Sequence, residues 1–328
     1  MKKVIFSVAI LFCVATVTAQ SNTSTITQKS FTSSIDVTQI GSENNADIVQ
    51  SGMYDNQAVV VQGGDVNTSI NGNITQNQFG SYSEVFAQQE QEENTISQKQ
   101  TGAFAVGFAT QNLHSSGGNN VAIQVQHSDI ESGGALAESV QNGSDNISRI
   151  FQFSTRRSTA TIEQTGERNL SEQLQRAANL ANTSRGVQFG SDNVLMQTQN
   201  DIYSSLYAIQ GNSLIGSNGN MIVQEQTGTS HSASAEQQGD GTSSVHGNLT
   251  MQKQQGDSNR AVSYQTGVAN VIDIFQDGFD NIAEVTQTAT NNSITIHQTG
   301  YFHSTVISQG NEYNIGGSTI TVYQSGSL

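Results

Sequence analysis

Polar and hydrophobic residues alternate along most of the chain with a period of two, which is the side-chain period of a β-strand. The segment 270–276, with the sequence NVIDIFQ, places Asn, Ile, Ile and Gln on one face and Val, Asp and Phe on the other. Four residues with a glycine at position 278 follow, a composition that permits a tight reversal of the backbone. The pattern predicts a strand of about seven residues followed by a turn of about four.

This strand-and-turn unit recurs every eleven residues. Gln stands at positions 254, 265, 276, 287, 298 and 309, and the same spacing returns in several earlier stretches. Counted from each Gln, Gly is favoured at +2, Asn at +5, a small or apolar residue at +7 and the next Gln at +11. About 25 residues end such a unit between Gln28 and Gln324. A fixed period of this kind predicts a repeat protein in which each unit is one supersecondary element.

Stacking of the units would order the many polar residues. If two units close one rung of a flattened coil, each strand pairs with its equivalents about 4.8 Å above and below. The inward Gln and Asn then form hydrogen-bonded ladders around a thin seam of small and aliphatic residues. Because an unpaired buried amide costs roughly 1–3 kcal/mol, such a ladder is favourable only while it is unbroken. The sequence therefore predicts an all-β fold, a β-solenoid with two strands per rung, tight glycine turns, about 25 strands and amyloid-like cross-β stacking. At that strand spacing the rod would be on the order of 60 Å long.

The unit assigns inward ladder positions and turn positions to particular residues. The predicted ladder, which would also carry self-assembly, consists of Gln39, Asn44, Gln50, Gln141, Asn146, Gln152, Gln164, Asn169, Gln175, Gln254, Asn259, Gln265, Asn270, Gln276, Asn281, Gln287, Asn292, Gln298 and Gln309. The predicted turn glycines are Gly41, Gly143, Gly166, Gly190, Gly256, Gly267, Gly278 and Gly300.

Some units are longer than eleven residues. Intervals of 14 to 17 residues precede Gln76, Gln126, Gln141, Gln226, Gln254 and Gln324, and their extra residues have loop-like compositions. Most of these insertions precede every second strand, so we expect them at one edge of the solenoid. The segment 76–100 keeps the period poorly and is expected to be an irregular part of the coil.

Composition agrees with a fold that lacks an ordinary core. The 328 residues include 38 Gln, 30 Asn and no Pro, and only 34% are hydrophobic, whereas globular chains are usually about 45–50% apolar. The absence of Pro fits strands that are paired on both sides, since each Pro would remove a hydrogen-bond donor from a sheet.

The first residues have the organisation of a secretory signal peptide. Lys2 and Lys3 precede an apolar stretch at 4–17, and small residues stand before Gln20. We predict cleavage after Ala19, which divides the chain into a signal peptide at 1–19 and a single repeat domain at 20–328. The only cysteine, Cys13, falls in the first segment, so the mature chain would have neither disulfides nor cysteine metal sites.

The remaining chemistry argues against an enzyme. The net charge of −15 disfavours nucleic acid as a partner, because no basic patch is large enough to neutralise a run of phosphates. No phosphate loop, zinc-protease helix or nucleophile elbow is present. His231 and His303 take the place of Asn at the +5 position, which favours a role in the ladder over metal ligation. We predict no catalytic residue, no cofactor and no metal site.

The unit Gln-x-Gly-x-x-Asn-x-Ala-x-x-x-Gln resembles the curlin repeat of bacterial curli, the secreted functional amyloids of biofilm matrix. The resemblance implies a structural subunit of an extracellular, cell-surface amyloid fibre for biofilm matrix and adhesion, assembled by adding β-strands rung on rung. It also implies specific partners: further copies of the chain, a curli-type nucleator or major subunit, an outer-membrane secretion pore and periplasmic chaperones. No membrane span is expected in the mature chain.

Two departures and one alternative bear on this interpretation. Where curlins often carry a second glycine just before the Asn, this chain has Glu43, Asp145, Arg168, Asp192, Ser258 and Asp280. It also lacks a basic tail after the last repeat, which favours the major subunit over the nucleator. The alternative function is a surface adhesin or binding rod built on a β-solenoid that does not polymerise.

Overall fold

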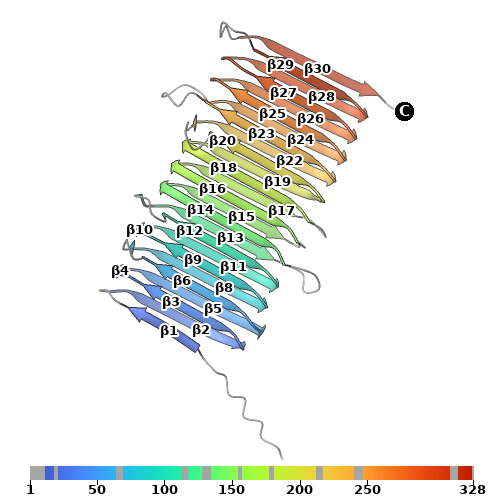
Figure 1. Cartoon of the computed structure of the whole chain (residues 1–328). Helices are drawn as coiled ribbons and strands as arrows, with labels where there is room; N and C mark the ends of the chain where they lie inside the picture. The colour runs from blue at the N-terminus through green and yellow to red at the C-terminus, as the bar shows by residue number, and fades with distance from the viewer. Residues whose placement is uncertain are drawn as a thin grey trace, which may run out of the picture.

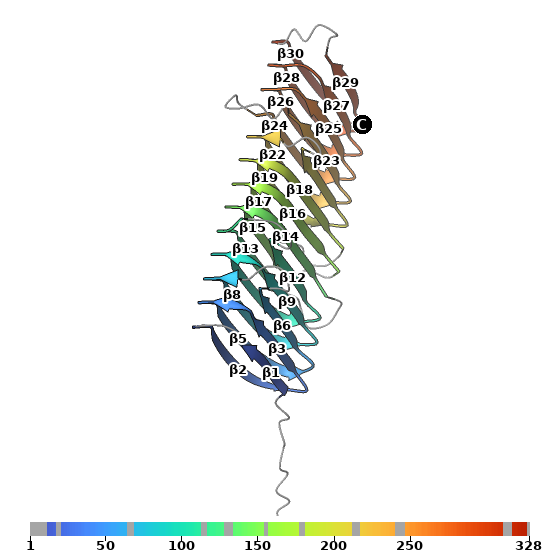
Figure 2. The ribbon, with the colours of Figure 1, turned by 60° about the vertical axis from the view of Figure 1, so that its left-hand side comes forward.

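The computed structural model describes residues 12–17, 21–63, 69–112, 117–127, 134–153, 157–176, 181–211, 217–239, 247–310 and 317–326. These residues form a rod of stacked strands that runs from the N-terminal end of the chain to the C-terminal end (Figure 1). The chain alternates between two parallel sheets, and Figure 2 shows these sheets as two layers along the rod.

One long sheet, here called sheet A, contains every second long strand. Its strands in order are β1 (Phe12–Val17), β3 (Ser34–Gln39), β6 (Gln57–Gln62), β9 (Glu84–Gln89), β12 (Val106–Gln111), β14 (Leu136–Ser144), β16 (Thr159–Glu167), β18 (Thr183–Ser191), β20 (Ser205–Gln210), β23 (Ser232–Gln238), β25 (Arg260–Thr266), β27 (Ile282–Gln287) and β29 (Ser304–Gln309). A short strand, β21 (Ser217–Asn218), also pairs with β18.

The second long sheet, sheet B, contains the strands between them. In order these are β2 (Thr23–Phe31), β5 (Asn45–Tyr54), β8 (Asn73–Ser81), β11 (Thr95–Ala103), β13 (Val121–His127), β15 (Ile147–Phe153), β17 (Leu170–Arg176), β19 (Val194–Ile202), β22 (Met221–Thr229), β24 (Leu249–Asp257), β26 (Val271–Phe279), β28 (Ser293–Tyr301) and β30 (Thr319–Gly326). A third, small sheet joins β4 (Gly41–Ser42), β7 (Ser69–Ile70) and β10 (Gln91–Glu92) at one edge of the rod.

The strands stack in register, so equivalent positions of successive units lie above one another. In sheet B, Gln254 pairs with Gln276 and Gln276 with Gln298, while in sheet A Gln265 pairs with Gln287. Inward positions are buried and alternate with half-exposed outward ones, as in β26. The predicted β-solenoid with two strands per rung is therefore confirmed. Its 26 long strands among the described residues agree with the predicted number.

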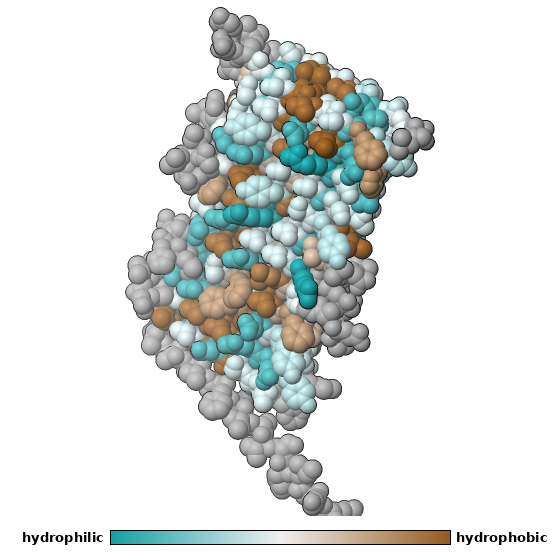
Figure 3. All heavy atoms as spheres, turned by 45° about the vertical axis from the view of Figure 1, so that its right-hand side comes forward, coloured by the Kyte–Doolittle hydropathy of each residue, from teal (hydrophilic) through white to brown (hydrophobic). Residues whose placement is uncertain are grey.

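The seam between the sheets is narrow, and its apolar residues are mainly Ala, Val and Ile. Its apolar residues fall into clusters along the rod, one in the N-terminal part around Ile48 and Ile74 and another in the C-terminal part around Ile274 and Ile296. Two smaller clusters lie between them. On the side of the rod drawn in Figure 3, hydrophobic patches lie among hydrophilic residues, and the larger patch is in the lower half.

The prediction that the segment 76–100 is irregular is wrong. β8 and β11 pair in continuous register from Asn73 with Thr95 to Ser81 with Ala103, and β9 pairs with β12 without a break. The unit-ending residue is Gln78 rather than Gln76, and from Gln78 the eleven-residue period runs through Gln89 and Gln100 to Gln111. The error arose because the segment contains additional Gln residues at inward positions.

Strand boundaries also differ from the prediction. Many strands continue past the closing Gln for three residues, as β26 does to Phe279, because the turn residues of neighbouring rungs pair as well. The reversal comes one residue before the Asn. Five of the six predicted insertions connect sheet A to sheet B and so occupy one edge, as expected.

The predicted signal peptide overlaps the solenoid. Residues 12–17 form β1, which pairs with β3 from Phe12 with Ser34 to Val17 with Gln39. The rest of the signal segment and the cleavage site after Ala19 lie outside the described residues, so the boundary between 1–19 and 20–328 stays a prediction.

Candidate self-assembly site

Two uninterrupted ladders of Gln side chains run along the rod. In sheet A the ladder passes through twelve Gln residues from Gln39 to Gln309, each Nε2 donating to the Oε1 of the next Gln at 2.8–3.4 Å. In sheet B it passes through thirteen from Gln28 to Gln324 at 2.7–3.4 Å. All of these amides donate toward the C-terminal end, so both ladders have the same polarity.

The same amides tie the two sheets together. The Nε2 of Gln276 in β26 also donates to the backbone oxygen of Arg260 in β25 at 3.0 Å, and that of Gln164 in β16 donates to Ile147 in β15 at 3.1 Å. One N–H of the amide thus bonds along the rod and the other across the seam. Because both donors are satisfied in a buried site, the cost of removing the amide from water is offset.

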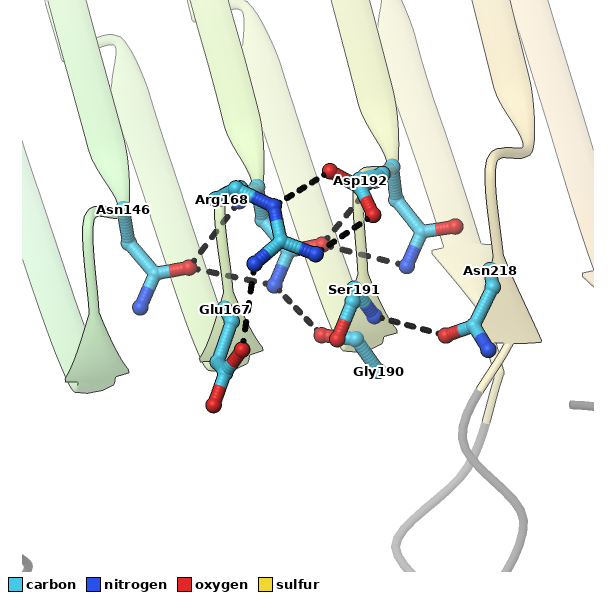
Figure 4. Close-up of polar contacts among 9 residues, drawn as sticks. Asn146, Glu167, Arg168, Gly190, Ser191, Asp192 and Asn218 are labelled. Carbon is cyan, nitrogen blue, oxygen red and sulfur yellow. Dashed lines mark hydrogen bonds and ion pairs between the residues drawn. The ribbon is translucent and has the colours of Figure 1, made fainter. Parts of the chain in front are cut away.

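Asn side chains at the +5 position form further ladders at the edges of the rod. The Oδ1 of Asn146 accepts from the backbone N–H and from the Nδ2 of Asn169, both at 3.1 Å, and Asn169 does the same for Asn193 (Figure 4). The Nδ2 of Asn169 also donates to the backbone oxygen of Gly190, in the turn of the next rung, at 2.8 Å. Asn at this position therefore joins each turn to the next one.

The turns require backbone conformations that glycine adopts readily. All eight predicted turn glycines have positive φ values, between 97° and 126°. A Cβ added at Gly166 would lie 1.9 Å from the backbone oxygen of Gly190, and one at Gly278 would lie 1.9 Å from that of Gly300. Glycine is therefore required both for its φ angle and for the close approach of neighbouring turns.

The residues that stand where curlins often carry a second glycine adopt left-handed backbone conformations although they are not glycine. All six residues quoted above for this position have φ between 52° and 59°. Among them, Arg168 donates to both carboxylate oxygens of Asp192, at 2.7 and 2.8 Å, and to Glu167 at 3.2 Å (Figure 4). These hydrogen bonds lower the pKa of Asp192 below its ordinary value. Charged side chains thus take part in the stacking of the exposed turns.

The two histidines at the +5 position belong to an edge ladder. His231 is buried, its Nδ1 accepts from the backbone N–H of Asn259 at 3.2 Å, and its Nε2 lies 3.1 Å from the backbone oxygen of Thr227. Burial lowers the pKa of His231. The backbone N–H of His303 donates to the Oδ1 of Asn281 at 3.0 Å.

Two shorter Gln ladders inside the seam were not predicted from the sequence. Gln76, Gln98 and Gln124 are linked at 2.9 Å, and Gln173, Gln197, Gln224 and Gln252 at 2.8 Å. They stand two residues before the closing Gln, where most units have Ile, Val or Ala. Gly107 and Gly186 make room across the seam, since a Cβ on either would approach these amides within 3.4 Å. The available signal was a second Gln two residues before the closing Gln, recurring in every second unit.

The predicted ladder residues occupy the expected inward positions. Their side chains are 3% exposed or less, apart from Gln309, which is half-buried in the last strand of sheet A. Their part in self-assembly stays a prediction. Within the described ranges no cluster of His, Cys, Asp and Glu is placed to hold a metal ion, and no helix there is long and apolar enough to cross a membrane.

The two ends of the rod differ in the groups that they leave without neighbours. Among the described residues, the Oε1 of Gln28, at the N-terminal start of the sheet B ladder, is buried and has no hydrogen-bond partner. At the C-terminal end the inward residues Ile320, Val322 and Gln324 of β30 are only half-buried. The first strand of sheet B thus carries an unpaired acceptor, and its last strand carries a half-buried amide and half-buried apolar side chains.

Comparison with known proteins gives one result. Residues 269–300, which comprise β26, β27 and most of β28, match the family model described as Curlin associated repeat. No curated protein sequence matches the chain. The chain therefore carries the curlin associated repeat, and the family resemblance predicted from its sequence is confirmed.

Proposed function

We propose that this protein is the structural subunit of an extracellular curli-like amyloid fibre that grows by end-on addition of one rod to the next. The observation that carries the proposal is the continuity of the two sheets and the two Gln ladders along the rod, with the sheet B ladder beginning on the unpaired acceptor of Gln28 and ending on Gln324. A repeat protein whose end rungs resemble its interior rungs has no intrinsic stop, and unpaired sheet edges are templates for further strands.

The register of the interior predicts how two rods would meet. β30 of one copy would pair with β2 of the next so that Gln324 stands on Gln28 and donates to its unpaired Oε1. Val322 would then lie on Ile26. Without β1, sheet A has twelve long strands and sheet B thirteen, so with β30 on β2 the β3 strand of the next copy would lie one strand spacing beyond β29. The Gln ladder of sheet B would continue across the junction with unchanged polarity.

Backbone groups at the two ends are complementary as well. Within the rod, the N–H of the first outward residue of a strand donates to the strand on its C-terminal side, as Val271 does to Asn292 and Ser293 to Ser318, each at 2.8–2.9 Å. By the alternation of a strand, Thr321 of β30 and Val306 of β29 direct their N–H groups toward an incoming copy. The Thr321 donor would be used directly by β2 of the next copy, and the Val306 donor belongs to the open edge of sheet A at the same end.

The strand β1 bears on when growth can start. It occupies the edge of β3 in register, with Val17 beside Gln39. Removal of residues 1–19 would free this edge. Signal-peptide cleavage during export would therefore open the N-terminal end of the chain for assembly.

The wider context of the proposal follows from the family. A curlin repeat on a β-solenoid indicates a structural protein rather than an enzyme. We infer a location at the cell surface or outside the cell, a role in biofilm matrix and adhesion, and partners of the curli type: a nucleator or major subunit, a secretion pore and periplasmic chaperones.

Proline substitution at the C-terminal end tests the proposal. Thr321→Pro combined with Val306→Pro removes two outward N–H donors and leaves the pairing of β30 with β28 and of β29 with β27 in place. The chain lacking residues 1–19 should form thioflavin-positive fibres with 4.8 Å diffraction, and the double variant should slow elongation at least tenfold. Thr321→Ala with Val306→Ala is the matched control and should elongate normally.

Two results would contradict the proposal. One is a parent chain that stays monomeric for days at high concentration, which would favour the alternative of a rod that does not polymerise. The other is an equal elongation rate for the proline and alanine variants, which would show that growth does not use these strand edges.

A further inference from the structure

The outward face of sheet B is strongly apolar over seven consecutive strands, from β13 to β26. Before its closing Gln each strand contributes three outward side chains, and 15 of these 21 are hydrophobic. They are Val121, Ile123, Val125, Ile147, Phe151, Leu170, Leu174, Val194, Met196, Met221, Val223, Leu249, Met251, Val271 and Phe275. We call this surface the apolar face.

One column of the apolar face contains no polar residue. The first outward position of each strand is stacked in register from Val121 through Ile147, Leu170, Val194, Met221 and Leu249 to Val271. These side chains are half-buried against their neighbours along the column, and near the middle of the face Met196 and Met251 are 39% and 37% exposed. The column is a continuous apolar ridge along half of the rod.

The fold does not require this surface. The four preceding strands of the same sheet, β2, β5, β8 and β11, have twelve outward residues before their closing Gln, of which only Val49 is hydrophobic, and the exposed Phe79 follows the closing Gln of β8. Their inward faces carry the same Gln ladder and pair in the same register. An extended exposed apolar surface that folding does not need is characteristic of an interaction site.

Charge favours a second copy of the chain as the partner. The whole chain has a net charge of −15, so most approaches of two copies are opposed. On the apolar face the charges are largely internal pairs, Arg149 with Glu172 at 3.5 Å and Lys253 with Glu225 at 3.2 Å. The remaining acid is Asp273, whose pKa is raised by burial. This face therefore presents little net charge to an identical one.

The area of the face is sufficient for a dimer. Seven strands at about 4.8 Å spacing and three outward positions spanning about 20 Å give about 34 × 20 Å, or roughly 680 Å². A stable protein interface buries about 800 Å² on each partner, which is close to this value before side-chain relief is added.

We propose that the apolar face packs against the same face of a second rod, so that two solenoids associate side by side through sheet B. The sheets would lie about 10 Å apart, as in other face-to-face packings. This contact uses no group at the ends of the rod, so it does not depend on the proposed end-on growth, and in a fibre it would pair two growing rods laterally.

Symmetry makes one residue diagnostic. β19 is the middle strand of the seven, and Met196 is its middle outward residue, so Met196 lies at the centre of the apolar face. Any two-fold contact that covers the whole face brings Met196 opposite the Met196 of the second copy. Thr75 holds the equivalent position in β8 of the polar part of sheet B and serves as the matched control.

Cysteine cross-linking in an end-blocked chain tests the proposal. In the full chain carrying Cys13→Ser, Thr321→Pro and Val306→Pro, we expect Met196→Cys to form a disulfide dimer under mild oxidation at least ten times faster than Thr75→Cys. Sedimentation of the end-blocked chain without added cysteines should show a reversible dimer. Met196→Glu with Val223→Glu should weaken dimerisation at least tenfold, with the urea midpoint of the monomer unchanged.

Several outcomes would overturn the proposal. An end-blocked chain that remains monomeric at 100 µM, or equal cross-linking at positions 75 and 196, would exclude the contact. Binding of the monomer to phosphatidylcholine vesicles, abolished by the glutamate variant, would assign the face to a lipid surface instead. Normal fibres from the unblocked glutamate variant, with no dimer in the blocked chain, would overturn only this proposal and leave end-on growth standing.

Discussion

Sheet B carries one ladder of closing Gln residues along its whole length but has two different outward faces. From β2 to β11 its outward residues are mainly Thr, Asn and Ser, whereas from β13 to β26 they are mainly Val, Ile, Leu and Met. The Gln ladder crosses the boundary unchanged, with Gln100 donating to Gln126 at 2.9 Å. The fold is therefore determined by the inward and turn positions, and the outward positions are free to vary with function.

The inward and outward residues differ in how far their identity is restricted because they lie in different environments. An inward amide has no water to replace a lost partner, so its neighbours above and below restrict it to Gln or Asn. An outward side chain on a β-strand faces solvent and is chosen by cross-strand contacts worth only about 0.2–1 kcal/mol. The following predictions test this division, in order of decreasing effect.

Turn glycines should be the most sensitive positions in both parts of sheet B. A Cβ at Gly80, near the end of β8, would lie 1.5 Å from the backbone oxygen of Gly102, and a Cβ at Gly278, near the end of β26, would lie 1.9 Å from that of Gly300. We expect Gly80→Ala and Gly278→Ala each to lower the free energy of unfolding by about 4 kcal/mol, measured by urea denaturation. Gly239→Ala is the control, because its nearest contact would be 3.5 Å away. A large loss of stability for only one of the two variants would contradict a turn geometry common to both parts of sheet B.

Ladder amides should come next. Gln78→Ala leaves the Nε2 of Gln50 and the Oε1 of Gln100 without their partner, and Gln276→Ala does the same to Gln254 and Gln298. Each should cost about 2–4 kcal/mol and slow fibre growth strongly.

The outward neighbours are the controls for these ladder variants. Asn77→Ala and Asp273→Ala should change stability and elongation little, since both side chains lie on the outward face. Equal effects for the inward and outward members of a pair would refute the assigned facing of the strand.

Lowering the pH should destabilise the part of the rod around His231 more than its N-terminal part. The pKa of His231 is lowered by burial, so its folded-state pKa lies below the ordinary 6.5, and the neutral form is favoured in the fold. Stability should therefore be complete above pH 6.5 and decrease as the pH falls, by less than about 1.4 kcal/mol per pH unit. Hydrogen exchange at pH 5 should accelerate around β22 to β24 but not in residues 21–103, which contain no His. In His231→Asn this pH dependence should disappear.

Outward substitutions in the polar part of sheet B should have the smallest effect. Thr75→Val and Ser97→Val, on β8 and β11, should change the free energy of unfolding by less than about 0.5 kcal/mol in chemical denaturation. A loss above about 1 kcal/mol would mean that the outward residues also specify the fold. A rise in dimer formation would extend the apolar face and strengthen its assignment to lateral contact.

Particular residues illustrate how much of the fold the sequence predicts. The alternation in 270–276 was sufficient to place Ile272, Ile274 and Gln276 inside, because one face of a strand must be buried when the other is solvated. The eleven-residue period was sufficient to stack Gln254, Gln276 and Gln298. It failed at Gln76, where two inward Gln residues two positions apart made the register ambiguous, and only pairing with Gln98 resolves it.

The sequence by itself determined the repeat, the two-stranded rung, the inward facing of Gln and Asn and the glycine turns, because these follow from local periods and from the conformational freedom of single residues. Only the tertiary structure decided the common direction of the Gln ladders, the unpaired Oε1 of Gln28, the place of β1 on the edge of β3 and the continuity of the apolar face. These features depend on which residues, 22 to 30 positions apart, meet across neighbouring rungs. Insertions of variable length change that spacing, so the residues that contact one another are known only once the register of the strands is known.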